Sequence, residues 1–90
     1  MNRRSSPNQE RAVSIRIAAE LTGVEIHTLR FWEQELPEFI VPLRTPGGQR
    51  RYRPADLQNI LILKRLLKDE LFSIAGARRR LGLDDDRRAA

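Results

Sequence analysis

The chain has 90 residues, a hydrophobic fraction of 40%, a charged fraction of 32% and a formal net charge of +5, which predicts one small soluble domain with a modest core. Of its 17 basic residues 15 are arginine, a bias that favours planar, bidentate recognition of phosphate. The chain has no cysteine, which excludes disulfides and thiolate metal sites, and no apolar run or signal sequence indicates a membrane segment or export. We therefore expect a cytoplasmic protein that needs no metal or cofactor.

The N-terminal part of the chain predicts a tail and then a first helix. Residues 1–12 are charged and contain serine and proline, so we expect a disordered tail. Ser14 can cap a helix over residues 15–22, and Gly23 can end it by adopting a positive φ. Helical spacing predicts an inner face made of Ile17, Ala18 and Leu21.

A second helix is predicted over residues 25–35, with Val24 filling the corner before it and Pro37 after its end. Ile26, Leu29 and Trp32 recur every three residues, so they share one face. This spacing places Trp32 in the core rather than stacked on a base. The residues expected to point away from that face are His27, Thr28 and Arg30.

An arginine-rich hairpin is predicted to follow. The sequence 45–48, Thr-Pro-Gly-Gly, can close as a type II turn with Gly47 at positive φ, which would pair flanks 39–43 and 50–52. No acidic residue falls between Glu38 and Asp56, so we expect uncompensated guanidinium groups. The hairpin is either a phosphate clamp or a merely basic surface loop. The clamp candidates are Arg44, Arg50, Arg51, Tyr52 and Arg53, and for Tyr52 we favour a phosphate-binding hydroxyl over a place in the core.

Two more helices are predicted beyond the hairpin, over residues 54–69 and 74–81. Most of the apolar residues of the third helix must lie in the core, whereas Ile62 and Leu66 are expected to stay partly exposed and available to a partner. In the fourth helix we expect Ile74, Ala77 and Leu81 to face inward and Arg78, Arg79 and Arg80 to face largely outward. Residues 83–90 are expected to form a frayed tail.

This order of elements predicts a mostly α fold, a four-helix winged helix-turn-helix with a short two-stranded β wing, over residues 13–82. The major groove of DNA is wide enough for the second helix, which makes His27, Thr28 and Arg30 groove-facing candidates. Glu33, Glu35 and Glu38 have no catalytic constellation around them, so ion pairs or plain exposure are expected and the protein is not expected to be an enzyme.

Three motifs carry a resemblance to a known family. They are Ile17-Ala18-Ala19-Glu20-Leu21-Thr22-Gly23-Val24, His27-Thr28-Leu29-Arg30-Phe31-Trp32-Glu33 and Arg44-Thr45-Pro46-Gly47-Gly48-Gln49-Arg50-Arg51-Tyr52. In this order and spacing they resemble the DNA-binding domain of the MerR family of bacterial transcription regulators, over about residues 13–82. The resemblance implies sequence-specific binding of double-stranded DNA at the nucleoid, with the recognition helix in the major groove.

The resemblance also implies roles for individual residues and partners. Arg30 would contact DNA with His27 and Thr28 beside it, and Arg16 on the first helix is a weaker candidate. The wing positions implied to meet the DNA backbone are Arg44, Gly48, Arg50, Arg51 and Tyr52. Family members bind operators as homodimers, and many distort the promoter spacer so that RNA polymerase can engage it.

The chain departs from the family pattern in two ways. It stops at Ala90, before the long dimerisation helix and the effector domain, so either it is an excised domain or the natural protein is short. With no cysteine and no effector domain, metal sensing as in some family members is not supported for this chain. Glu25 stands where the family often has a capping serine, and its carboxylate disfavours direct phosphate contact by that helix end.

Two alternative functions stay open. An excisionase-like architectural factor would have a similar winged fold and would bend DNA during recombination, with direct repeats as its sites. A protein-interaction module would use Ile62 and Leu66 to dock a partner, and its binding would lack the steep salt dependence of phosphate contacts.

Overall fold

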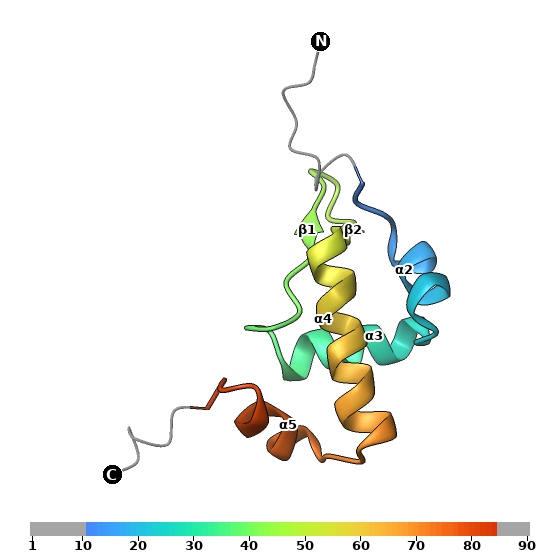
Figure 1. Cartoon of the computed structure of the whole chain (residues 1–90). Helices are drawn as coiled ribbons and strands as arrows, with labels where there is room; N and C mark the ends of the chain where they lie inside the picture. Colours follow the sequence, from blue (N-terminus) through green and yellow to red (C-terminus); the bar gives the residue numbers. More distant parts are fainter. Residues whose placement is uncertain (1–10, 85–90) are drawn as a thin grey trace.

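A computed structural model describes residues 11–84, which form four helices and one antiparallel hairpin (Figure 1). The elements in chain order are α2 (Ile15–Thr22), α3 (Ile26–Glu35), β1 (Leu43–Arg44), β2 (Arg50–Arg51), α4 (Pro54–Lys64), the π-helical turn η1 (Arg65–Asp69) and α5 (Ile74–Arg80). The predicted winged helix-turn-helix fold is thereby confirmed. The predicted tails lie outside the described residues except at 11–12 and 83–84.

Local capping sets both ends of α2 where the sequence predicted them. The Ser14 hydroxyl accepts a hydrogen bond from the Ile17 amide at 3.2 Å. At the other end Gly23 adopts a φ of 74°, in the left-handed region, and its amide donates to the Ala19 carbonyl at 2.8 Å. The chain then turns through the buried Val24 into α3, which makes the helix-turn-helix corner.

The predicted inner face of α2 is only partly right. Ala18 is buried, but Ile17 is 39% exposed and Leu21 is 61% exposed. Thr22 is buried in their place, because its hydroxyl donates to the Ala18 carbonyl at 2.8 Å and so brings no unsatisfied polar group into the core. The buried face therefore follows the i, i+4 pair of Ala18 and Thr22, rotated away from the two larger residues.

The core gathers around α3, whose Leu29 and Trp32 are buried as predicted, and around Leu36 at the helix end just before Pro37. Phe31, next to the tryptophan, is 48% exposed. The buried hydrophobic residues are Ala18, Val24, Leu29, Trp32, Leu36, Ile40, Tyr52, Ile60, Leu63, Leu66 and Ala77. They come from every helix and from the hairpin, so the wing is part of the same core.

The hairpin is shorter than predicted and its turn is of a different type. The Gly48 amide donates to the Thr45 carbonyl at 2.8 Å, which closes the expected turn. The positive φ, 88°, falls on Gly48 and not on Gly47, so the turn is not of type II. This arrangement matches hairpins in which a left-handed glycine follows the turn.

The strands pair Leu43 with Arg51 and Arg44 with Arg50. Beyond them Tyr52 makes an antiparallel bridge with Val13, through mutual amide–carbonyl hydrogen bonds of 2.7 and 2.8 Å. The sequence did not predict this bridge. It fixes the start of α2 beside the wing.

The third predicted helix has its expected length but not a single geometry. Its first eleven residues are α4, and its last turn is η1, where the Glu70 amide donates to the Arg65 carbonyl five residues earlier at 2.9 Å. Leu71 follows with a φ of 60°. Of the two residues expected to be partly exposed, Ile62 is 43% exposed, whereas Leu66 is buried at 7%.

Helix α5 begins at the predicted cap, since the Ser73 hydroxyl accepts from the Gly76 amide at 3.0 Å. Arg78 does not face outward as predicted. Its guanidinium donates to both carboxylate oxygens of Glu38 at 2.9 and 2.8 Å and to the Glu35 carbonyl at 3.0 Å. Arg78 thereby ties α5 to the segment that follows α3.

Candidate nucleic-acid interface

Helix α3 exposes the three side chains predicted to face a DNA groove. Leu29 and Trp32 bury the opposite side of the helix, which leaves His27 and Arg30 exposed and Thr28 half-buried. The structure therefore presents them on an outer surface. Their contact with DNA stays a prediction.

The N-terminal end of α3 carries a negative charge. Glu25 is the N-cap residue, but its side chain makes no capping hydrogen bond. Its carboxylate is 78% exposed and lies 3.4 Å from Nε2 of His27. A carboxylate in this position opposes an approaching phosphate, which agrees with the reading that this helix end does not hold one.

A groove beside the wing brings four of the predicted residues together. It has a volume of about 450 Å³ and lies between the start of α2, the middle of α3 and the tip of the hairpin. Its lining residues are Ser14, Ile15, Arg16, Arg30, Gly48, Gln49 and Arg50. Three are arginines and none is acidic, so we name this feature the arginine groove. Its charge and concave shape suit a phosphate group.

Two wing arginines are paired with an acidic residue, contrary to the expectation of uncompensated charge. Nη2 of Arg44 lies 3.1 Å from Oε2 of Glu33, and Nε of Arg50 donates to Oε1 of the same carboxylate. Glu33 comes from α3, 11 residues before Arg44 and 17 before Arg50. The hairpin sequence itself contains no acidic residue, so its partner is visible only once α3 is packed beside it.

Two other clamp candidates hold the fold together. Nη2 of Arg51 donates to the Ala12 carbonyl at 2.9 Å. Arg53 forms a two-point pair with the buried carboxylate of Asp56, at 2.8 and 3.0 Å, and also donates to the Val41 carbonyl at 2.9 Å. The hydrogen bonds that Arg53 donates to the Asp56 carboxylate raise the pKa of Arg53 above its usual value. These donors are therefore used within the protein, at the base of the wing and the start of α4.

Tyr52 contradicts its predicted role most directly. Its side chain is fully buried, and its hydroxyl has no hydrogen-bond partner among the described residues. Burial and the nearby Glu33 carboxylate raise the pKa of Tyr52 to about 12. Tyr52 is thus a core residue of the wing, because the bridge to Val13 turns it inward, and a phosphate cannot reach its hydroxyl.

Sequence reasoning missed four residues of this surface: Ser14, Ile15, Gln49 and Glu33. Ser14 was identified as a helix cap, but its place beside the wing depends on the bridge between Val13 and Tyr52. Glu33 was expected to be paired or exposed, with no partner assigned. In both cases the missing information is a contact between segments far apart in the sequence.

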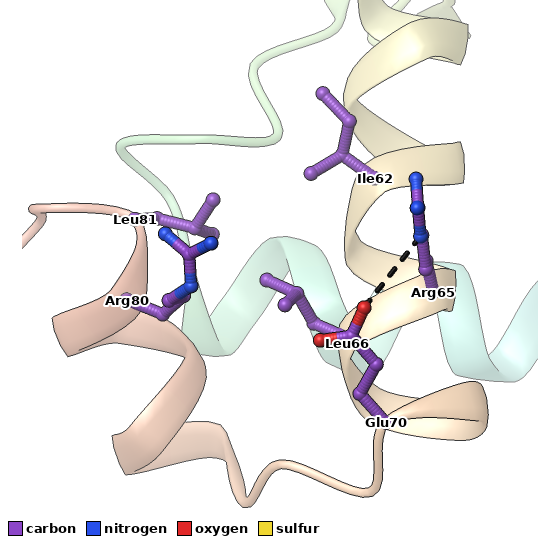
Figure 2. Close-up of a pocket in the computed structure, with 6 residues that line it drawn as sticks. All are labelled: Ile62, Arg65, Leu66, Glu70, Arg80 and Leu81. Carbon is purple, nitrogen blue, oxygen red and sulfur yellow. Dashed lines mark ion pairs between the residues drawn. The ribbon is translucent and has the colours of Figure 1, made fainter.

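A second groove lies between η1 and α5 and bears on the protein-interaction alternative. Figure 2 shows its lining residues, Ile62, Arg65, Leu66, Glu70, Arg80 and Leu81. It has a volume of about 270 Å³, and an exposed ion pair of 3.6 Å joins Arg65 to Glu70 at its rim. Because Leu66 is buried, Ile62 alone remains of the two predicted docking residues.

In the part of the chain that the structure describes, no helix is long and apolar enough to cross a membrane.

Comparison with known proteins agrees with this architecture. A sequence model of the family described as "MerR HTH family regulatory protein" matches residues 13–83. The HTH-type transcriptional repressor CarH of Myxococcus xanthus is 43% identical over 68 residues, which are 76% of this chain and 22% of that protein. The HTH-type transcriptional regulator TnrA of Bacillus subtilis is 32% identical over 56 residues, 62% of this chain and 49% of that protein. The chain thus spans less than half the length of either relative.

Proposed function

The chain belongs to the MerR family of helix-turn-helix regulatory proteins, and on that premise we propose that it binds specific sequences of double-stranded DNA and regulates transcription. The relatives are named as a repressor and a regulator, and this non-enzymatic chain shares their helix-turn-helix region. A protein with this function works at the bacterial nucleoid, in the cytoplasm.

The arginine groove is the observation that carries the proposal. Arg16, Arg30 and Arg50 come from three different elements and line one concavity without an acidic neighbour in its lining. Guanidinium groups in such an arrangement can hold one or two backbone phosphates. Arg30 lies on the exposed side of α3, so the same helix can read base edges in the major groove with His27 and Thr28.

The wing has a divided role in this proposal. Arg50 and the tip glycine Gly48 face the arginine groove, and Arg44 is 48% exposed beside them. The buried Tyr52 and the internally bonded Arg53 hold the hairpin on the domain. The wing would therefore supply affinity and orientation, while sequence choice falls to α3.

Family membership also supports a homodimer on an inverted repeat and contact with RNA polymerase at a distorted promoter, and we include both in the proposal. An excisionase-like factor would select direct repeats instead. A protein-interaction module would select no sequence.

Selection of bound sequences from a random duplex pool tests these alternatives. We expect the wild type to enrich an inverted repeat. Arg30→Ala should relax sequence preference as well as weaken binding, because it removes a groove contact. Arg79→Ala is the matched control, since it removes the same charge from an exposed position on α5. Equal enrichment by both variants would refute the groove role of Arg30, and no enrichment by the wild type would refute the function.

A further inference from the structure

Glu33 joins the recognition helix to the wing through one carboxylate. Its two oxygens contact Arg44 at 3.1 Å and Arg50 at 2.5 Å. Those two arginines are directly opposite each other in the hairpin register. A residue of α3 therefore bridges both strands of the wing.

This bridge reduces the electrostatic repulsion between the two facing arginines of the hairpin. Like charges directly opposite each other in an antiparallel pair destabilise it, and a hairpin with strands of two residues is marginal by itself. The Glu33 side chain is 17% exposed and that of Arg50 is 24% exposed, so water screens this pair less than an ordinary surface ion pair. Glu33 offsets one of the two positive charges and draws the hairpin toward α3.

The pairing leaves the outer edge of Arg50 available. Arg50 uses Nε toward Glu33, and neither of its Nη atoms donates a hydrogen bond within residues 11–84. A guanidinium has five N–H donors in a rigid fork, so fixing the Nε edge also fixes the direction of the others. Arg50 thus lines the arginine groove with its Nε edge bonded to Glu33.

We propose that Glu33 is a positioning residue for DNA binding, which sets the angle of the wing against α3 and aims Arg50 at a backbone phosphate. The inference rests on the proposed function. It opposes the alternative in which Glu33 competes with phosphate for the two arginines, because in that case removing the carboxylate would strengthen binding.

Glu33→Gln and Glu35→Gln form a matched pair for the test. Both remove one negative charge from α3, but Glu35 is exposed and its side chain makes no ion pair within residues 11–84. On a duplex carrying the selected site, we expect E33Q to bind about tenfold more weakly than E35Q, the size of a coupling within one ion-pair network. The slope of the logarithm of its binding constant against the logarithm of salt concentration should be shallower by roughly one, the value of one lost phosphate contact. Equal affinity in the two variants, or tighter binding and a steeper slope in E33Q, would overturn the proposal.

A double-mutant cycle tests whether Glu33 acts through Arg50. The E33Q change should cost much less affinity in the R50Q background than in the wild type, because only the contact between Glu33 and Arg44 then remains. Independent, additive losses would contradict the inference. Glu33→Asp keeps the charge but shortens the reach by one methylene, so it should also weaken binding, and full affinity in E33D would refute positioning.

One readout is independent of DNA. The NMR signal of the Arg50 Nε–H group should lose its ion-paired shift in E33Q and keep it in E35Q, and an unchanged signal in E33Q would remove the contact on which the inference depends. If the wild type shows no salt-dependent DNA binding, the proposed function fails. If the wild type binds and E33Q matches E35Q, the role of Glu33 alone fails.

Discussion

Replacing Tyr52 with Phe should stabilise the domain and leave DNA binding unchanged. The ring is fully buried and its hydroxyl lacks a hydrogen-bond partner among the described residues. A buried unsatisfied polar group costs about 1–3 kcal/mol, whereas losing one oxygen from the packing costs less, so we expect a net gain of about 1 kcal/mol. For a domain of this size such a gain raises Tm by roughly 4–8 °C.

The same variant has a signature at high pH. Tyr52 has a pKa of about 12 in the folded protein because of burial and the Glu33 charge. In the unfolded chain its pKa is about 10, so the stabilisation present below pH 10 is lost as the pH rises through the folded pKa. At pH 11 the wild type has lost about 1.4 kcal/mol by this route, and Y52F, which removes the one tyrosine of the chain, has not.

Urea unfolding of both proteins at pH 8 and pH 11, followed by circular dichroism and by Trp32 fluorescence, measures both effects. The stability gap should favour Y52F at pH 8 and widen by about 1.4 kcal/mol at pH 11. A gap that stays constant, or a variant less stable than the wild type at pH 8, would refute the reasoning from burial. A loss of DNA affinity in Y52F would show that the Tyr52 hydroxyl contacts a phosphate after all.

Three further predictions concern the backbone and acid stability. Leu71→Gly should stabilise the domain by about 0.5 kcal/mol in thermal unfolding. Leu71 is 79% exposed at a φ of 60°, and glycine removes the cost of the left-handed backbone conformation. A loss of stability would show that the Leu71 side chain packs against the domain. Gly48→Ala should destabilise by about 1 kcal/mol from its φ of 88° alone, because a Cβ there meets nothing within 4 Å, and an unchanged Tm would contradict this. Hydrogen bonding to Arg78 lowers the pKa of Glu38 to about 2. The stability that the ionised Glu38 contributes should therefore be lost as the pH falls from about 4.5 toward 2. Faster amide exchange in α5 should be the first sign of this loss. The α5 amides of Glu38→Gln should exchange fast at neutral pH too, and slow exchange in that variant would show that the pair between Glu38 and Arg78 does not hold α5.

Signals that act over a few residues were read correctly from the sequence. Ser14 and Gly23 define α2 because a cap and a left-handed stop are local properties of the chain. Trp32 was placed in the core because its spacing to Leu29 continues one face of a helix. The turn closed where Pro46 and its glycines predicted, although the positive φ fell one residue later.

The failure at α2 has a cause within the helix, whereas the failures at Tyr52 and at the wing arginines come from contacts between distant segments. Helical spacing gives candidate faces of α2, but Thr22 could displace Leu21 only because its hydroxyl is satisfied within the helix. The bridge from Val13 turned Tyr52 inward, and Glu33 reached the wing from another element. The arginine count of the hairpin therefore predicted its charge correctly but not which arginines are free to bind.

The central claim is that the arginine groove holds the phosphates of duplex DNA, and the salt dependence of affinity tests it most directly. The log-log slope should fall in magnitude by about two in Arg16→Gln/Arg50→Gln relative to the wild type, one for each lost contact. In Arg79→Gln/Arg80→Gln, which removes the same charge from exposed positions on α5, the slope should not change. An unchanged slope in the first variant, or an equal fall in the second, would contradict the account.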